Sequence, residues 1–347
     1  MTTPTLDIIV PVWNQPFETR ACLVSILAAT DSARLIIVNN GCNRDTELLL
    51  EEFCDPLGDR VLYMSMERNI GFVPAINRAL ARSTADWAMV IRPNGIVADT
   101  CLQTLLPLTG HDRAGIVSPL CTTETPLSPY VARASCSHLE TDVISFAGLL
   151  LSRVMREEIG LFDEELDGGQ WCLRDYQQRA AAHHYRTLYA PAAIIQSGPS
   201  LRLGSEERRR EREAASRELC RQLWGLPRSY AVYFPKQTEI THLDEALNTI
   251  LAAARLGDRF TLFLHHLQYR QAAALGYRCL HTAIELVSLA RLTPHRDLRI
   301  RLRSLPAGDL GLTVIKGVDG IPVPGHDQAQ PFTAVHQRIT EVSTCRT

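Results

Sequence analysis

Three features that would each have defined the class of this protein are missing from its sequence. No uncharged apolar run approaches the ~18 residues that a membrane span needs, so we expect no spanning helix. The start of the chain has no basic segment followed by an apolar core, so we expect no signal peptide. The ten cysteines include no Cys-x-x-Cys pair, which argues against a zinc ribbon or a disulfide scaffold. We interpret them as reduced, mostly buried thiols of a cytoplasmic protein, with a peripheral position at the inner face of the membrane as the alternative.

The charges of the chain are unevenly distributed, although the formal net charge is only −2. Residues 1–199 carry 15 Lys and Arg against 23 Asp and Glu, whereas residues 200–305 carry 18 against 11. Either the basic region favours an anionic surface, or the two regions attract each other. We expect no nucleic-acid partner.

Short apolar runs alternate with helical patterns through the first part of the chain. The predicted strands are residues 6–12, 35–38, 61–64 and 88–91, and helices are predicted after Asn14, over 46–53 and over 73–82. Asn14 is expected to cap the first helix, with Pro16 in its first turn. This alternation predicts an α/β fold, a mainly parallel sheet with helices on both faces. Ligands of such sheets lie beyond the carboxyl ends of the strands, so Pro11, Asn39 and Arg92 are expected to line one cleft.

The chain is predicted to have three parts. Residues 1–225 form the α/β domain, and residues 226–305 form a helical extension. Residues 306–347 form a segment with a hairpin-like pair around Gly317 and Gly320, followed by a polar tail. The C-terminal helices are expected to pack on the domain, on a second copy of the chain or on a partner enzyme.

Five segments, in this order, resemble family 2 glycosyltransferases, which have the GT-A type of fold. They are Val-Pro-Val-Trp-Asn (10–14), Val-Asn-Asn-Gly-Cys (38–42), Arg-Asn-Ile-Gly-Phe (68–72), Ile-Arg-Pro-Asn (91–94) and Gly-Leu-Phe-Asp-Glu (160–164). No segment is specific alone, but their order and spacing are. The resemblance extends over roughly residues 5–225 and implies a Rossmann-like, GT-A type domain.

The resemblance also implies a nucleotide sugar as the donor substrate. The residues whose positions match the nucleotide-sugar site are Pro11, Val12, Trp13, Asn14, Asn39, Arg68, Asn69, Gly71, Asn77, Arg92, Pro93 and Asn94. The acceptor that it implies is a glycan, a lipid-linked molecule or a protein.

The sequence departs from the family pattern at four positions that carry its chemistry. The nucleoside-binding Asp is replaced by Asn39, and the metal-binding Asp of the fourth strand by Asn94, with Arg92 two residues before it. A His that often completes the metal site is replaced by Gln196. The catalytic base falls on Trp171-Cys172 or Cys172-Leu173, with Asp167 and Asp175 the nearest acids, and Asp175 is our catalytic candidate.

Neutral amides are poor ligands for a hard dication, so we expect no divalent metal cofactor. In one interpretation the protein is an active, inverting-type hexosyl- or related glycosyltransferase in which Arg92 replaces the metal and holds the diphosphate. In another it is a pseudoglycosyltransferase that serves as a binding or scaffolding module. Some other nucleotide chemistry is the third interpretation. The sequence leaves all three open.

Overall fold

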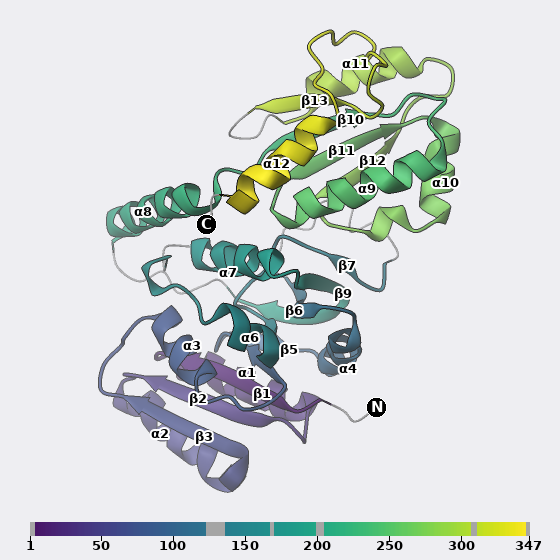
Figure 1. Ribbon diagram of the computed structural model, residues 1–347. Coiled ribbons are helices and arrows are strands. Elements are labelled where there is room, and N and C mark those ends of the chain that lie inside the picture. Colours follow the sequence, from purple (N-terminus) through teal and green to yellow (C-terminus); the bar gives the residue numbers. More distant parts are fainter. Residues whose placement is uncertain (1–3, 123–135, 167–169, 199–204, 307–310, 345–347) are drawn as a thin grey trace. The chain divides into compact units, whose positions relative to one another are not determined.

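The computed structural model describes residues 4–122, 136–166, 170–198, 205–306 and 311–344. The chain divides into two compact units. Unit 1 comprises residues 1–126 and 143–220, and unit 2 comprises residues 127–142 and 221–347 (Figure 1). Each unit is an α/β structure with its own sheet, and each is described by itself below.

Strands and helices alternate through the first half of unit 1, as predicted. Its strands are β1 (Leu6–Val12), β2 (Arg34–Asn40), β3 (Val61–Met66), β4 (Trp87–Val90), β5 (Gly95–Val97), β6 (Ala114–Cys121), β8 (Leu149–Ser152) and β9 (Arg186–Ser197). Its helices are α1 (Pro16–Ala29), α2 (Arg44–Cys54), α3 (Phe72–Leu80), α4 (Cys101–Leu105), α6 (Arg153–Ile159) and α7 (Trp171–Ala182), with short 3-10 turns at Asp55–Arg60, Leu106–Gly110 and Glu164–Leu166. Helix α8 (Glu206–Trp224) extends across the division between the units.

The sheet of unit 1 is mixed and mostly parallel, which confirms the predicted fold class. Its strand order is β3-β2-β1-β4-β8-β6-β9-β5. Strands β3, β2, β1 and β4 run parallel, as do β6 and β9, whereas β8 is antiparallel to both of its neighbours and β5 is antiparallel to β9.

Alternate residues of β1 face opposite layers of unit 1. Ile8 and Val10 share a core cluster with Cys22, Leu23 and Ile26 of α1. The same cluster includes residues of α2 and α4, so these helices cover one face of the sheet. Helix α3 packs against β1 and β2. Burial on both faces explains why the strand sequences are continuously apolar.

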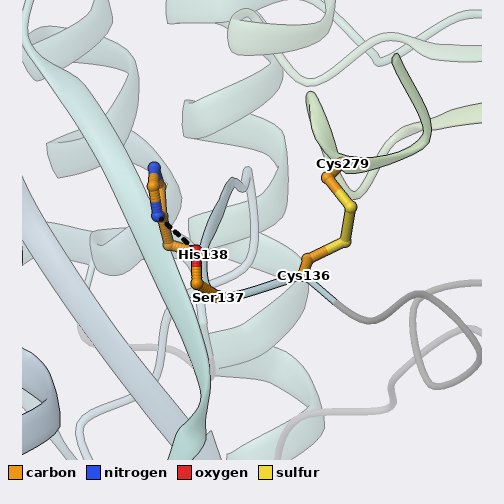
Figure 2. The surroundings of a disulfide bond; sticks show 4 residues. All are labelled: Cys136, Ser137, His138 and Cys279. Atoms are coloured by element: carbon orange, nitrogen blue, oxygen red, sulfur yellow. Dashed lines mark hydrogen bonds between the residues drawn. A yellow bond between two sulfur atoms is a disulfide. The ribbon is translucent and has the colours of Figure 1, made fainter. Parts of the chain in front are cut away.

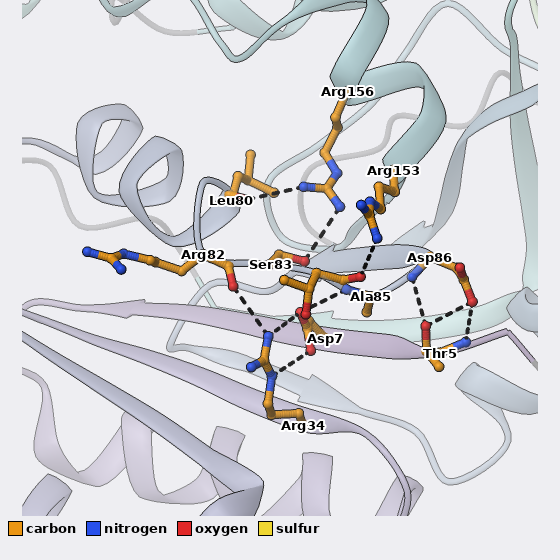
Figure 3. Close-up of polar contacts among 11 residues, drawn as sticks. Thr5, Asp7, Arg34, Leu80, Arg82, Ser83, Ala85, Asp86, Arg153 and Arg156 are labelled. Carbon is orange, nitrogen blue, oxygen red and sulfur yellow. Dashed lines mark hydrogen bonds and ion pairs between the residues drawn. The ribbon is translucent and has the colours of Figure 1, made fainter.

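A polar network closes the amino edge of the sheet of unit 1 (Figure 3). Asp7 of β1 accepts hydrogen bonds from Nε of Arg34 at 2.9 Å and from Nη2 of Arg34 at 2.8 Å. Arg34 begins β2 directly beside Asp7 in the parallel register. Burial acts to raise the pKa of Asp7, but the hydrogen bonds from Arg34 and Ser83 outweigh it, so that pKa lies below its ordinary value. The ionised pair therefore joins β1 to β2.

The sheet of unit 2 is fully parallel, with the strand order β12-β11-β10-β13. The elements of unit 2 are β7 (Leu139–Glu140), which is not part of this sheet, β10 (Ser229–Tyr233), α9 (Ile240–Arg255), β11 (Arg259–Leu264), α10 (His266–Ala274), a 3-10 turn (Tyr277–Cys279), β12 (Ile284–Ser288), α11 (Pro294–Ser304), β13 (Leu312–Lys316) and α12 (Thr333–Thr344). One core cluster joins the sheet to α9, α10 and α12, and another joins its opposite face to α11.

The prediction of a helical extension over residues 226–305 is wrong, because β10, β11 and β12 lie within it. Phe260, Leu262 and Leu264 of β11 belong to the core cluster on one face of the sheet, and Phe263 belongs to the cluster on the other. Such a strand is apolar at successive positions, and a short apolar run does not by itself distinguish a buried strand from a helix.

The predicted hairpin around Gly317 and Gly320 is also wrong. Strand β13 pairs in parallel with β10, with Lys316 opposite Tyr233. Gly317 follows directly, and its N–H donates to the carbonyl of Tyr233 at 2.8 Å. A Cβ at position 317 would lie 2.6 Å from that oxygen, so glycine is required where β13 leaves the sheet. The turn residues thus end a parallel strand and do not reverse a hairpin.

Two cysteines form a disulfide, so our interpretation of all ten as reduced thiols is wrong for this pair. Cys136 and Cys279 are bonded, with their Cα atoms 5.7 Å apart (Figure 2). They are separated by 143 positions in the sequence, and no local spacing shows that both belong to unit 2. The residues after Cys136 are also tied to this unit, because the carboxylate of Glu140 accepts from Nε and Nη2 of Arg255 at 2.5 and 2.7 Å.

No helix within the described ranges has both the length and the apolar character that crossing a membrane requires. Helix α8 begins directly after Ser205, whose hydroxyl accepts a hydrogen bond from the backbone N–H of Arg208 at 3.3 Å.

Candidate functional site

The carboxyl ends of β1, β2 and β4 meet at one edge of the sheet of unit 1. In the parallel register Val12 of β1 lies opposite Asn39 of β2, and Ile9 lies opposite Val90 of β4. The N–H of Ile91 continues the ladder by donating to the carbonyl of Ile9 at 2.9 Å. Neighbouring parallel strands therefore deliver the predicted positions Pro11, Asn39 and Arg92 to one edge, as expected for a ligand site of an open α/β sheet.

Two buried asparagines follow one another at the end of β2 and have different partners. Asn39 donates from Nδ2 to the hydroxyls of Tyr63 and Ser65 at 3.1 and 3.3 Å, and its Oδ1 accepts from the N–H of Cys42 at 2.9 Å. Asparagine side chains commonly make such local hydrogen bonds to the backbone of a turn. The side chain predicted to hold the nucleoside is thus already engaged within the protein.

Asn40 connects the turn after β2 to the turn before α3. Its Nδ2 donates to Oδ1 of Asn69 at 3.2 Å and to the carbonyl of Gly71 at 3.0 Å, and its Oδ1 accepts from the N–H of Ile70 at 3.0 Å. A Cβ at Gly41, whose φ is +70°, would lie 2.4 Å from the carbonyl carbon of Arg68. The two turns are therefore in direct backbone contact.

Asn14 does not cap α1, so that prediction is wrong. The N-cap residue is Gln15, whose side chain makes no capping hydrogen bond, and Pro16 begins the helix as predicted. Oδ1 of Asn14 instead accepts from the N–H of Asn43 at 2.8 Å. Asn14 and Gln15 have φ values of 56° and 59°, which asparagine tolerates better than most residues. The turn after β1 is thus fixed to the turn after β2.

Arg92 lies in the loop between β4 and β5, with its guanidinium carbon 5.6 Å from the centre of the Phe72 ring. Its carbonyl accepts from the N–H of Gly95 at 2.9 Å and from the thiol of Cys22 at 3.4 Å. Burial raises the pKa of Cys22 to about 12, so the thiol stays protonated and can donate. Arg92 and Pro93 are half-buried. The loop is therefore held by its backbone, while the cation stacks on the first residue of α3.

Asn94 is hydrogen-bonded to the end of β9, the strand on which the family pattern has its histidine. Its Nδ2 donates to the carbonyl of Gly198 at 3.2 Å, and its own carbonyl accepts from the N–H of Gly198 at 3.4 Å. Gln196 pairs with Ile96 in the antiparallel ladder and is exposed. The structure therefore brings positions 94 and 196, where the family pattern has metal ligands, into neighbouring segments.

A chain of aromatic contacts runs from Phe72 to helix α7. The ring centres are 5.3 Å apart for Phe72 and Phe146, 5.1 Å for Phe146 and Phe162, and 4.1 Å for Phe162 and Tyr176. Arg179 ends the chain, with its guanidinium carbon 5.0 Å from the centre of the Tyr176 ring. These contacts connect the loop of Arg92 to the segment 160–164, which the family pattern places on the acceptor side.

Asn77 fixes that same segment, although the sequence suggested a role in donor binding. Its Nδ2 donates to the carbonyl of Phe162 and to Oε1 of Glu164, both at 2.9 Å, and its Oδ1 accepts from the N–H of Phe162 at 3.1 Å. The side chain is buried inside unit 1. These contacts favour a positioning role for Asn77.

Asp175 lies on α7 and is buried against Arg179. Its Oδ2 accepts from Nε of Arg179 at 2.8 Å, and the other guanidinium nitrogens donate to the carbonyls of Ile159 and Leu161 at 2.6 and 2.9 Å. The ion pair thereby holds the turn through Gly160. A catalytic role for Asp175 stays a prediction, and Asp167 lies outside the described residues.

Several residues of this edge were missed in the sequence. Asn40 was passed over in favour of Asn39 because only the latter matches a family acid. Phe72 was quoted as part of a motif but given no role, although an aromatic residue next to a helix start and a cation elsewhere on the edge is a signal for stacking. The remaining predicted residues are Pro11 and Val12, which are buried, Trp13, which is half-buried, and Arg68 and Asn69, which are exposed.

At the positions where the family pattern has metal ligands, this edge has neutral amides and a cation. The loop that would supply a carboxylate has Arg92 and Asn94, and the amide of Asn94 is bonded to Gly198. Throughout the described ranges, no three His, Cys, Asp or Glu side chains gather closely enough to hold a metal ion. Hard divalent cations need anionic oxygen ligands, and a guanidinium in their place repels them.

The fold of unit 1 and the residues at its carboxyl edge can now be compared with known proteins. Residues 7–136 match the family model described as Glycosyl transferase family 2. No curated protein sequence matches the chain.

Two solved structures illustrate the likeness in fold. The mannosyltransferase PcManGT from Pyrobaculum calidifontis, in complex with GDP-Man and Mn²⁺, is 14% identical with a TM-score of 0.50, over 79% of this chain and 76% of that one. GalNAc-T7 with UDP, GalNAc and Mn²⁺ is 13% identical with a TM-score of 0.52, over 64% of this chain and 49% of that one. This chain thus spans about half the length of GalNAc-T7. Both likenesses support the GT-A type of fold.

Proposed function

We propose that the chain is a glycosyltransferase that transfers a sugar from a nucleotide sugar, and that Arg92 takes the place of a divalent metal ion at the diphosphate. The observation that carries this proposal is the position of the guanidinium. It lies at the edge where β1, β2 and β4 end, 5.6 Å from the centre of the Phe72 ring. The family match over residues 7–136 supports the reaction class. The two similar structures contain GDP-Man or UDP together with Mn²⁺, which is the ion that Arg92 would replace.

In this proposal Arg92 binds the diphosphate and stabilises the negative charge that develops on it. A guanidinium presents a planar set of donors that can contact two phosphate oxygens at once. Stacking on Phe72 limits the orientations of this plane before the donor binds. When the glycosidic bond to the phosphate breaks, negative charge grows on the departing nucleotide, and a fixed cation stabilises that state more than the ground state.

The first turn of α3 supports the same assignment. The helix begins at Phe72, and its N-cap residue is Gly71, which has no side chain to cap it. Phe72 and Val73 have N–H groups at this helix start, whereas Pro74 has none. Such N–H groups favour phosphate, so the donor would lie between this turn and Arg92. Asn40 and Asn69 hold the turn from beneath.

The acceptor side is assigned by position only. Asn77, Phe162 and the Asp175–Arg179 pair keep the segment 160–164 against the aromatic chain that starts at Phe72. Asp175 would act through Arg179 as a positioning residue. The acceptor would be a glycan, a lipid-linked molecule or a protein.

Calorimetric titration with UDP- and GDP-sugars in EDTA tests the role of Arg92. A guanidinium–phosphate contact contributes about 1.5–3 kcal/mol, so Arg92→Ala should weaken binding roughly ten- to hundredfold. Asn94→Ala should change the affinity much less, because its amide is bonded to Gly198. Arg82→Ala is the matched control, since this exposed arginine follows α3 at the opposite, amino edge.

Two further measurements distinguish the proposal from the alternatives. The first repeats the titration with Mn²⁺ in place of EDTA, and the second measures release of the nucleotide in the presence of an acceptor. Unchanged affinity in Mn²⁺ supports the proposal, and tighter binding that depends on Asn94 contradicts it. Binding without turnover of any acceptor would identify the non-catalytic module. If the wild-type protein binds no nucleotide sugar, the transferase function is wrong.

A further inference from the structure

The segments that follow the carboxyl ends of β11 and β12 in unit 2 form a cationic edge, defined here by Arg270, Arg291, Arg296, Leu267 and Leu292. Strands β11 and β12 are paired, with Leu264 opposite Ser288. Leu267 follows three residues after the first strand, and Leu292 follows four residues after the second. Because neighbouring parallel strands end at the same edge, both loops emerge together (Figure 1).

The cationic edge has little negative charge to balance it. Residues 265–276 and 289–296 contain Arg270, Arg291, Arg296 and three histidines, but no Asp or Glu. The nearest acid in sequence, Asp297, is engaged: it accepts from the N–H of Ala290 at 2.9 Å and from Nε of Arg301 at 3.0 Å. The three arginines are exposed. They therefore present a positive field to the solvent.

The loop after β10 joins the same edge. Burial, and then the neighbouring charges of His295 and Lys236, lower the pKa of His265 below its ordinary value. His265 follows β11, His295 is the second residue of α11 and Lys236 follows β10, so side chains from three segments lie near one another. Lys236 is exposed and adds a further cation, against one exposed acid, Glu239, in its own loop.

Two leucines project from between these cations. The side chain of Leu292 is 91% exposed and that of Leu267 is 66% exposed. Leu267 and Arg270 are three residues apart on α10, so they share one face of that helix. Transfer of an exposed leucine side chain from water to an apolar environment is favourable.

We propose that the cationic edge docks unit 2 on the surface of a bilayer that contains anionic lipids, with Leu267 and Leu292 inserted among the lipids. Arginines attracted to anionic headgroups, with separate apolar side chains between them, are the composition of an interfacial membrane site. A protein interface of stable size would need a broader apolar centre with aromatic residues, and this edge has two isolated leucines. The inference does not depend on the function proposed for unit 1.

Vesicle flotation with the full-length protein tests the docking. The wild type should float with phosphatidylcholine vesicles that contain phosphatidylglycerol, should not float with phosphatidylcholine alone, and should be released by salt. Each arginine near such a surface changes the partition coefficient roughly fivefold, so Arg291→Glu with Arg296→Glu should lower it by roughly 25-fold or more. Leu292→Ser should lower it roughly three- to tenfold.

Matched controls come from other parts of the same unit. Arg259→Glu reverses an exposed charge at the start of β11, at the amino edge. Leu275→Ser removes a leucine that is 57% exposed after the end of α10. Both should leave the partition coefficient unchanged within about twofold, which is small beside the fivefold effect of a docking arginine.

Insertion is measured separately with Leu292→Trp, whose added fluorescence should shift to the blue with anionic vesicles and be quenched by brominated lipid. Three results would overturn the proposal. They are failure of the wild type to float, equal flotation of wild type and Leu292→Ser, and a concentration-dependent dimer in sedimentation velocity that Leu292→Ser dissociates, which would assign the edge to a second copy of the chain.

Discussion

The two units of this chain share a strand order and differ in what they place at its two edges. Numbered along the chain, β3-β2-β1-β4 in unit 1 and β12-β11-β10-β13 in unit 2 both read third, second, first, fourth. The carboxyl edge of unit 1 is rich in amides around Arg92, whereas that of unit 2 has exposed cations and leucines. A common sheet thus serves two kinds of surface, because function lies in the loops and stability in the scaffold.

The amino edges show how each scaffold is stabilised. In unit 1 Asp7 pairs with Arg34, whose side chain is 34% exposed. In unit 2 Asp258 pairs with Arg338 at 3.2 Å, with side chains 0% and 6% exposed. Burial raises the pKa of Asp258 above its ordinary value, although Arg338 and the N–H of Arg228 act to lower it. The pair in unit 2 is therefore the more costly to break.

Asp258→Ala should have the largest effect. It leaves the guanidinium of Arg338 buried without its charge partner, which typically costs about 3–5 kcal/mol of the free energy of unfolding. Denaturant titration followed by hydrogen exchange should show the loss in unit 2 alone. Arg338→Met in the same chain should restore part of it, since the unpaired charge is removed. Equal losses in both units would contradict the independence of the two scaffolds.

The disulfide should rank second. Cys279→Ser removes the bond to Cys136, and loss of a native disulfide costs about 2–4 kcal/mol. Reductant should produce the same loss in the wild type and no further loss in the variant. The readout is hydrogen exchange of residues 136–142, which also contact the rest of unit 2 through Glu140 and Arg255. If exchange there does not change, the bond does not stabilise this segment.

The sequence predicted those parts of the two sheets that depend on local patterns, and failed where the structure depends on contacts between distant residues. Strand β1 was predicted with its observed bounds, because an apolar run meets a turn sequence at Trp13. Residues 260–264 were mistaken for helix, because their alternation between two faces is hidden when both faces are apolar.

The candidate site was predictable in position but not in its contacts. The order of the motifs predicted that Arg92 lies at the carboxyl edge of the sheet, and the structure places it after the end of β4. The contact of Asn77 with Phe162 spans 85 positions, and no local pattern shows that its amide is engaged there. The stacking of Arg92 on Phe72 likewise joins segments that follow different strands, β4 and β3, of one sheet.

The pair in unit 1 should be easier to break than that in unit 2. Asp7→Asn weakens hydrogen bonds to a charged group and should cost about 1.5–3 kcal/mol. Arg34 is partly exposed and can turn to water, which limits the loss. Because the pKa of Asp7 is lowered on folding, its contribution is present above the ordinary value of 3.8 and is lost as the pH falls through the folded value. Acid titration of unit 1 by hydrogen exchange should show this dependence in the wild type and not in Asp7→Asn.

A final difference between the units should appear in mild acid. His281 of unit 2 is buried, and its Nδ1 accepts from the N–H of Ala283 at 3.0 Å, so the imidazole is neutral in the folded protein. Burial, with a smaller contribution from Arg255, lowers its pKa from 6.5 to about 3. The unfolded chain therefore binds a proton that the folded chain does not, and stability falls as the pH falls below the unfolded value.

This loss should reach about 1.4 kcal/mol at about pH 5.5 and grow by a similar amount for each further pH unit. His281→Asn keeps an acceptor for the N–H of Ala283 and removes the titrating group, so it should flatten the dependence. The comparison is best made above about pH 5, because the raised pKa of Asp258 adds an opposite slope just above its ordinary value of 3.8. Thermal unfolding of wild type and variant across this range, with unit 1 as the internal reference, measures the difference. A wild-type unit 2 as insensitive to mild acid as unit 1 would show that His281 is protonated without unfolding.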